Sequence, residues 1–124
     1  MQPRDFIDVL EDPQLPPCQA SGEGPELLRS LLVHLFFIDH DLDKRELKLL
    51  ERVLPGVNVR DYVTTVAART LDLQRLAAAF PSYEQRRDIL VLAQHAAWGD
   101  DKLVARERAV LLRLSEALGI PEPG

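Results

Sequence analysis

The sequence predicts an all-α fold, a single compact bundle of about six or seven helices. Two stretches, 27–38 and 86–98, carry apolar side chains around most of a helical circumference, which is typical of helices at the centre of a bundle. Capping residues and Pro or Gly breaks divide the rest of the chain into helical lengths, and no run of alternating β-branched residues competes. With 124 residues, 46% of them hydrophobic, the chain can form one domain with a sizeable core.

The amino-terminal part, residues 1–24, is expected to be a short helix followed by an arm rich in Pro and Gly. A periodic stretch over 5–10 provides the short helix. The helical domain is expected to span 25–120, with a tail at 121–124. Pro25 suits the first position of its first helix, which should reach about Ile38.

A second helix is predicted to begin at Asp43, because Asp43 and Glu46 form a D-x-x-E capping pattern, and to end before Pro55. The alanine-rich stretches 61–68 and 72–79 then favour two short helices. Ser82, with Gln85 three residues later, indicates the start of a long helix that reaches about Trp98. The last helix should cover 104–118 and end at Gly119.

Composition argues against several classes of function. A net charge of −5 opposes binding to a nucleic-acid backbone. A single cysteine, Cys18, cannot form an intramolecular disulfide, and the acidic, Pro-broken amino terminus does not resemble a signal peptide. The longest apolar run, 31–38, is too short to span a bilayer, so membrane association is expected only through a partner. We therefore expect a cytoplasmic protein, with another protein as its partner.

The sequence contains an internal duplication with an offset of 61 residues. It aligns 31–52 with 92–113 and gives eight identical positions. Matching leucines carry little weight, because core positions recur in any helical sequence. The polar frame H-x4-D-x6-E is more specific, and it occurs once as His34, Asp39 and Glu46 and again as His95, Asp100 and Glu107. The repeat predicts two helix-loop-helix halves that cover each other's apolar faces.

Acidic side chains crowd both predicted inter-helix loops. The first loop offers four carboxylates within eight residues and the second offers three, so each is a candidate site for a hard divalent cation such as Ca²⁺, Mg²⁺ or Mn²⁺. The candidate ligands are Asp39, Asp41, Asp43, Glu46, Asp100, Asp101 and Glu107. The first loop is not an EF-hand, because it lacks the glycine at position six and its glutamate comes too early. Helix capping is the alternative role for these acids.

These loops resemble the repeated acidic pattern of the TerB-like family of tellurite resistance, whose domain also precedes the J domain in DnaJ-like membrane co-chaperones. The resemblance lies in segments 38–46 and 99–107 and extends over about 25–120. The family's glycine after the aspartate is His40 in the first loop and Asp101 in the second. The resemblance implies a seven-helix domain, metal binding, and a role in stress-response complexes.

Two functions remain open from the sequence. The first is a non-catalytic module that binds a divalent cation, a protein partner or both through the acidic loops. The second is a metal-dependent hydrolytic enzyme that uses the same carboxylates with His40. His34 and His95 precede their aspartates by five residues, which places them about 140° apart around a helix. Each is therefore expected to be a core or interhelical histidine with a hydrogen-bonded neighbour, with metal ligation as the alternative.

Overall fold

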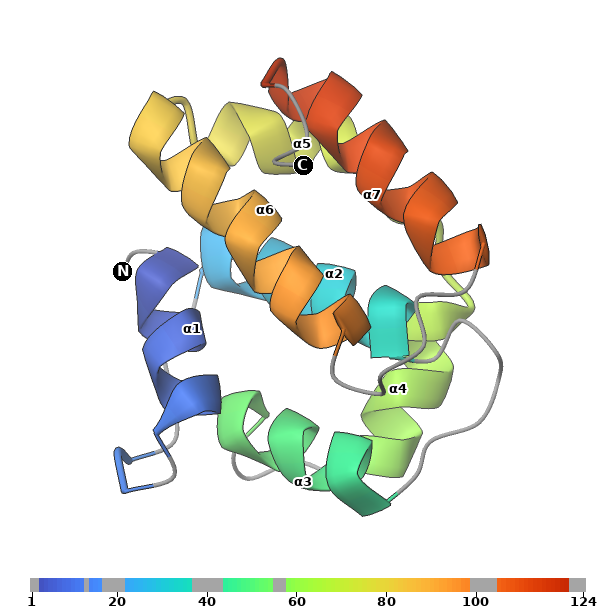
Figure 1. Cartoon of the computed structure of the whole chain (residues 1–124). Coiled ribbons are helices and arrows are strands. Elements are labelled where there is room, and N and C mark those ends of the chain that lie inside the picture. The colour runs from blue at the N-terminus through green and yellow to red at the C-terminus, as the bar shows by residue number, and fades with distance from the viewer. Residues whose placement is uncertain are drawn as a thin grey trace.

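The structure is a computed structural model that describes residues 3–12, 14–16, 22–36, 44–54, 58–98 and 105–120, without the side chains of 95–98 and 105–107. Within these ranges the chain forms seven α-helices and no strand, so the predicted all-α fold is confirmed (Figure 1). The helices are α1 (Pro3–Glu11), α2 (Glu23–Phe36), α3 (Lys44–Val53), α4 (Val59–Ala67), α5 (Leu73–Ala79), α6 (Tyr83–Trp98) and α7 (Ala105–Leu118). None of them is both long enough and apolar enough to cross a bilayer.

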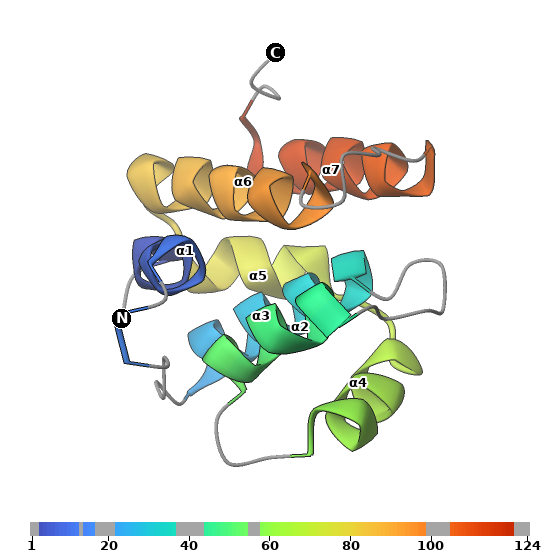
Figure 2. The same cartoon turned by 60° about the horizontal axis from the view of Figure 1, so that its bottom comes forward.

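Helix α2 lies at the centre of the bundle and contacts α3, α4, α5 and α6. Its residues Leu28, Leu31 and Leu32 are fully buried, as the all-round apolar pattern predicted. Helices α6 and α7 pack side by side at the top of Figure 2, with α1 and α5 beneath them and α2 and α3 lower still. The buried face of α6 contributes Ile89 and Leu92 to the same core.

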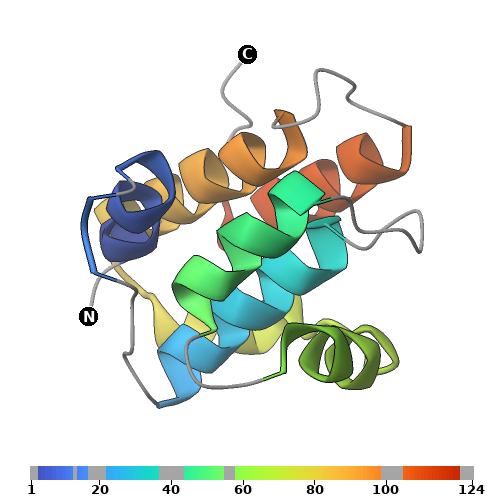
Figure 3. The ribbon, with the colours of Figure 1, turned by 90° about the horizontal axis from the view of Figure 1, so that it is seen from below.

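Helix α1 packs on the bundle, where it contacts α6 and α3 (Figure 3). Phe6 is fully buried, and Ile7 and Val9 are nearly so. The sequence predicted this helix, but its pattern gave no sign that Phe6 enters the core of the domain. Burying an aromatic side chain contributes roughly 1.5–3 kcal/mol, so α1 adds to the stability of the whole bundle.

The helix ends follow the sequence signals closely. Asn58 and Asp72 cap α4 and α5 by accepting backbone N–H groups from the first turn of each helix. Gly119 has a φ of +69°, and the N–H of Ile120 donates to the carbonyl of Ser115, which is a Schellman ending. Helix α2 begins at Glu23, two residues before the predicted start at Pro25, which is still tolerated within the first turn.

An arginine on the first helix of each half binds the carbonyl of the last residue of the second helix. Arg29 on α2 donates through Nε to the Val53 carbonyl at 2.6 Å. Arg86 on α6 donates through Nη1 to the Leu118 carbonyl at 3.1 Å. In the 61-residue overlay, Arg86 lies four positions before the residue that aligns with Arg29. This shift matches the lengths of the second helices, because α7 has 14 residues and α3 has 10. In both halves, an arginine of the first helix thus donates a hydrogen bond to the last carbonyl of the second helix.

Arg86 also joins a third helix to this arrangement. Its Nε and Nη2 atoms donate to the carbonyls of Phe80 and Ala77, both 2.9 Å away, at the end of α5. Because carbonyls at helix ends lack intrahelical partners, one guanidinium here satisfies acceptors of both α5 and α7. The neighbouring Arg87 is exposed.

We expect Arg86→Gln to lower the free energy of unfolding by about 2 kcal/mol, because part-buried carbonyls lose their charged donor. Arg87→Gln removes the same charge from an exposed position and should leave stability nearly unchanged. Urea denaturation followed by circular dichroism measures both changes. Equal stability of the two variants would contradict a structural role for Arg86.

Candidate functional site

The two acidic segments predicted from the sequence lie between α2 and α3 and between α6 and α7. Within the described residues, Glu46 is the one candidate ligand whose side chain is placed, and Glu107 has its backbone in the first turn of α7. The others lie outside the described residues: Asp39, Asp41, Asp43, Asp100 and Asp101, together with His40. No group of three or more His, Cys, Asp or Glu side chains that could hold a metal occurs in the described part. Metal ligation therefore stays a prediction, as does the hydrolytic alternative.

Helix boundaries place Glu46 and Glu107 at the same register. Helix α3 begins at Lys44 and α7 at Ala105, 61 residues later, so each glutamate is the third residue of its helix. Glu46 is only 7% exposed, whereas Lys44 and Arg45 beside it are exposed. A carboxylate in the first turn is stabilised by the partial positive charge of the helix amino terminus. Glu46 therefore lies on the inner face of α3, at the point where the first acidic segment ends.

The directions of the helices bring the limits of both acidic segments to one side of the molecule. Helices α2 and α6 contact each other and run in the same general direction (Figures 1 and 2). The carboxyl ends of these two helices and the amino ends of α3 and α7 all face that side. The two segments therefore leave and re-enter the bundle at neighbouring helix ends.

His34 lies near the carboxyl end of α2 and makes a backbone hydrogen bond with Val66 on α4. The predicted interhelical histidine with a hydrogen-bonded neighbour is thus confirmed for His34. Burial lowers its pKa below 6.5, and the hydrogen bond with Val66 opposes this shift. Its Nε2 atom is buried and has no hydrogen-bond partner among the described residues. The side chain of His95 is not described.

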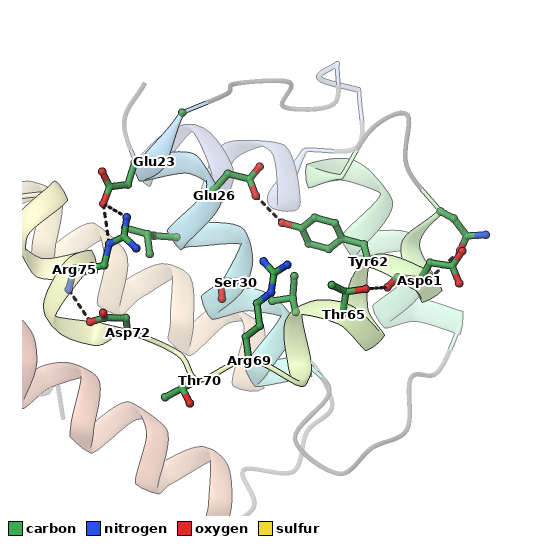
Figure 4. Close-up of a pocket in the computed structure, with 14 residues that line it drawn as sticks. Glu23, Glu26, Ser30, Asp61, Tyr62, Thr65, Arg69, Thr70, Asp72 and Arg75 are labelled. Carbon is green, nitrogen blue, oxygen red and sulfur yellow. Dashed lines mark hydrogen bonds and ion pairs between the residues drawn. The ribbon is translucent and has the colours of Figure 1, made fainter.

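A polar groove of about 990 Å³ opens between α2, α4 and α5 (Figure 4). Glu23 accepts two hydrogen bonds from Arg75, at 2.8 and 3.0 Å. Glu26 accepts one from the hydroxyl of Tyr62 at 2.8 Å. Burial, followed by this bond to Glu26, raises the pKa of Tyr62 to about 12, so the hydroxyl stays protonated as a donor. These pairs fasten α4 and α5 to the start of α2.

Comparison with known proteins identifies the family of the chain. A family model described as "Tellurite resistance protein TerB" matches residues 26–123. The chain belongs to the TerB family. No curated protein and no solved structure matches it. The family suspected from the acidic segments is thus confirmed.

The sequence of this TerB domain contains no signal for the polar groove. Glu23 and Arg75 are 52 residues apart, and Glu26 and Tyr62 are 36 apart, so no local spacing relates them. Arg75 resembles any exposed arginine on a short helix, for which solvation is the default expectation. Only the packing of α4 and α5 against α2 brings these partners together.

We expect the TerB domain to lose stability when the pH falls from about 7.5 to about 5.5. The native pKa of His34 lies below its unfolded value of 6.5, so the unfolded chain binds the proton first as the pH falls. His34 thus contributes stability above pH 6.5, and this contribution is lost as the pH falls toward the native pKa. His34→Gln should reduce the loss, measured by urea denaturation at each pH. A native His34 that titrates at or above 6.5 by NMR would contradict this assignment.

Proposed function

We propose that this TerB domain is a non-catalytic module that binds a divalent cation through its two acidic segments. A protein partner then binds the end of the bundle that carries these segments and the cation. The ligands are drawn from Asp39, Asp41, Asp43 and Glu46 in the first half and from Asp100, Asp101 and Glu107 in the second. Ca²⁺, Mg²⁺ and Mn²⁺ are the expected ions, because they prefer carboxylate oxygens.

The observation that carries the proposal is the common position of the four helix ends that bound the acidic segments (Figures 1 and 2). A repeat alone would be compatible with segments on opposite faces, where each would act by itself. Here α2 and α6 run in the same direction, which supports a single acidic end of the bundle to which both halves contribute.

The dipoles of these helices also suit the proposed chemistry. The carboxyl ends of α2 and α6 carry partial negative charge and attract a cation. The amino ends of α3 and α7 carry partial positive charge and stabilise the carboxylates of the segments that precede them. A bound cation would neutralise the remaining repulsion between the acids and fix the geometry that the partner meets.

The proposal predicts that each effective ion raises the melting temperature. At an ion concentration about 100 times Kd, binding to the folded state adds about 2.7 kcal/mol, which amounts to several degrees for a domain of this size. Asp39→Asn combined with Asp100→Asn should abolish the gain. Differential scanning calorimetry with and without each ion gives the comparison.

Glu84→Gln is the matched control, because Glu84 is an exposed acid in the first turn of α6, far from the carboxyl end of that helix. This variant should keep the full gain in melting temperature. A wild-type domain that does not respond to any of the three ions would overturn the proposal, and so would a gain that survives the double substitution.

A further inference from the structure

A second groove lies between α1 and α3, two helices whose ribbons can be followed in Figure 3. It has a volume of about 940 Å³. Its lining combines three apolar and five charged side chains: Val9, Leu10 and Leu49 with Lys44, Arg45, Lys48, Glu51 and Arg52. The groove is therefore partly apolar, and all of its charged side chains come from α3.

The charge of this groove is opposite to that of the chain. Four Lys or Arg residues and one Glu line it, while the whole chain carries a net charge of −5. Lys44 and Lys48 are exposed and make no ion pair with any described residue. Arg52 donates through Nη2 to the carbonyls of Asp12 and Leu15, which fix its position, and it makes no ion pair with another residue of the described ranges. Lys44 and Lys48 therefore bring two positive charges to the groove that no described residue pairs.

The position of Lys44 is not explained by the stability of its helix. Lys44 is the first residue of α3, where the partial positive charge of the helix amino terminus repels a cation. Lys48 follows four residues later, so both ammonium groups lie on the same face of α3. Two cations at this spacing weaken an isolated helix slightly, and a negatively charged occupant would reverse that effect.

Besides its charge, the groove offers an apolar surface that a partner can contact. Leu10 on α1 and Leu49 on α3 are half-buried, and Val9 on α1 is buried. Leu49 lies between Arg45 and Arg52 along α3, at spacings of four and three residues. Apolar contacts bordered by charge on one side match an amphipathic helix, whose apolar stripe adjoins a charged one.

We propose that the α1–α3 groove docks an acidic amphipathic helix of a partner protein. Leucine-type side chains of that helix would contact Leu10 and Leu49, and carboxylates four residues apart would meet Lys44 and Lys48. A helix reaches the recessed leucines, whereas a flat anionic bilayer meets only the exposed ammonium groups at the rim. The α1 wall precedes residues 26–123, the part that the TerB family model matches.

The test uses a fluorescein-labelled helical peptide of about 16 residues, with Glu at two positions four apart beside a stripe of Leu. Binding is followed by fluorescence anisotropy in about 50 mM salt, where screening is modest. Lys44→Glu combined with Lys48→Glu should weaken binding about tenfold or more. Arg87→Glu combined with Arg108→Glu is the control, because it makes the same change in net charge at exposed positions on α6 and α7.

The control variant should bind the peptide as the wild type does, and a peptide with Gln in place of Glu should bind at least about tenfold more weakly. Unchanged melting temperatures would show that both double variants fold. Equal weakening by the two double variants, or equal binding of the Gln peptide, would overturn the proposal. So would binding to phosphatidylglycerol vesicles that depends on Lys44 and Lys48 while the peptide does not bind.

Discussion

The buried guanidinium of Arg29 is the interaction on which the arrangement of the first half depends. It donates to the carbonyl of Val53 and to Glu26, and it lies over the ring of Phe6 with 5.6 Å between the guanidinium carbon and the ring centroid. A buried charge without partners would cost several kcal/mol, so α1, α2 and the end of α3 must meet around it. Arg86 places a similar constraint on the second half. In each half, the arginine holds the carboxyl end of the second helix, α3 or α7, against the first helix, α2 or α6.

Helix α3 connects the two surfaces for which we propose functions. Its inner face carries the buried Glu46 next to the first acidic segment, and its outer face carries Lys44 and Lys48 on the α1–α3 groove. The proposed cation-binding end and the α1–α3 groove would therefore adjoin across one helix of ten residues. Because Arg29 and Phe6 fix the position of α3 against α2 and α1, changes in the core should affect both surfaces.

The sequence predicts the helices well, because caps, breaks and apolar periodicity are local signals. Gly119 ends α7 where the sequence places the end of that helix, and Asp72, at the start of the predicted stretch 72–79, caps α5. Helix α4 begins at Val59, two residues before the predicted stretch 61–68, because Asn58 caps it there. Contacts between distant residues leave no such trace, and so the burial of Phe6 and the pairing of Glu23 with Arg75 required the structure. The candidate ligands of the acidic site were found by the repeat and by resemblance, and five of the seven lie outside the described residues.

The central claim is that both acidic segments form one cation-binding end. The most direct measurement is paramagnetic broadening of amide NMR signals by small amounts of Mn²⁺. The account predicts broadening at the carboxyl ends of α2 and α6 and at the amino ends of α3 and α7, with sharp signals at the opposite ends of α2 and α6. Broadening next to only one segment, or spread evenly over exposed acids such as Glu84 and Asp61, would contradict it.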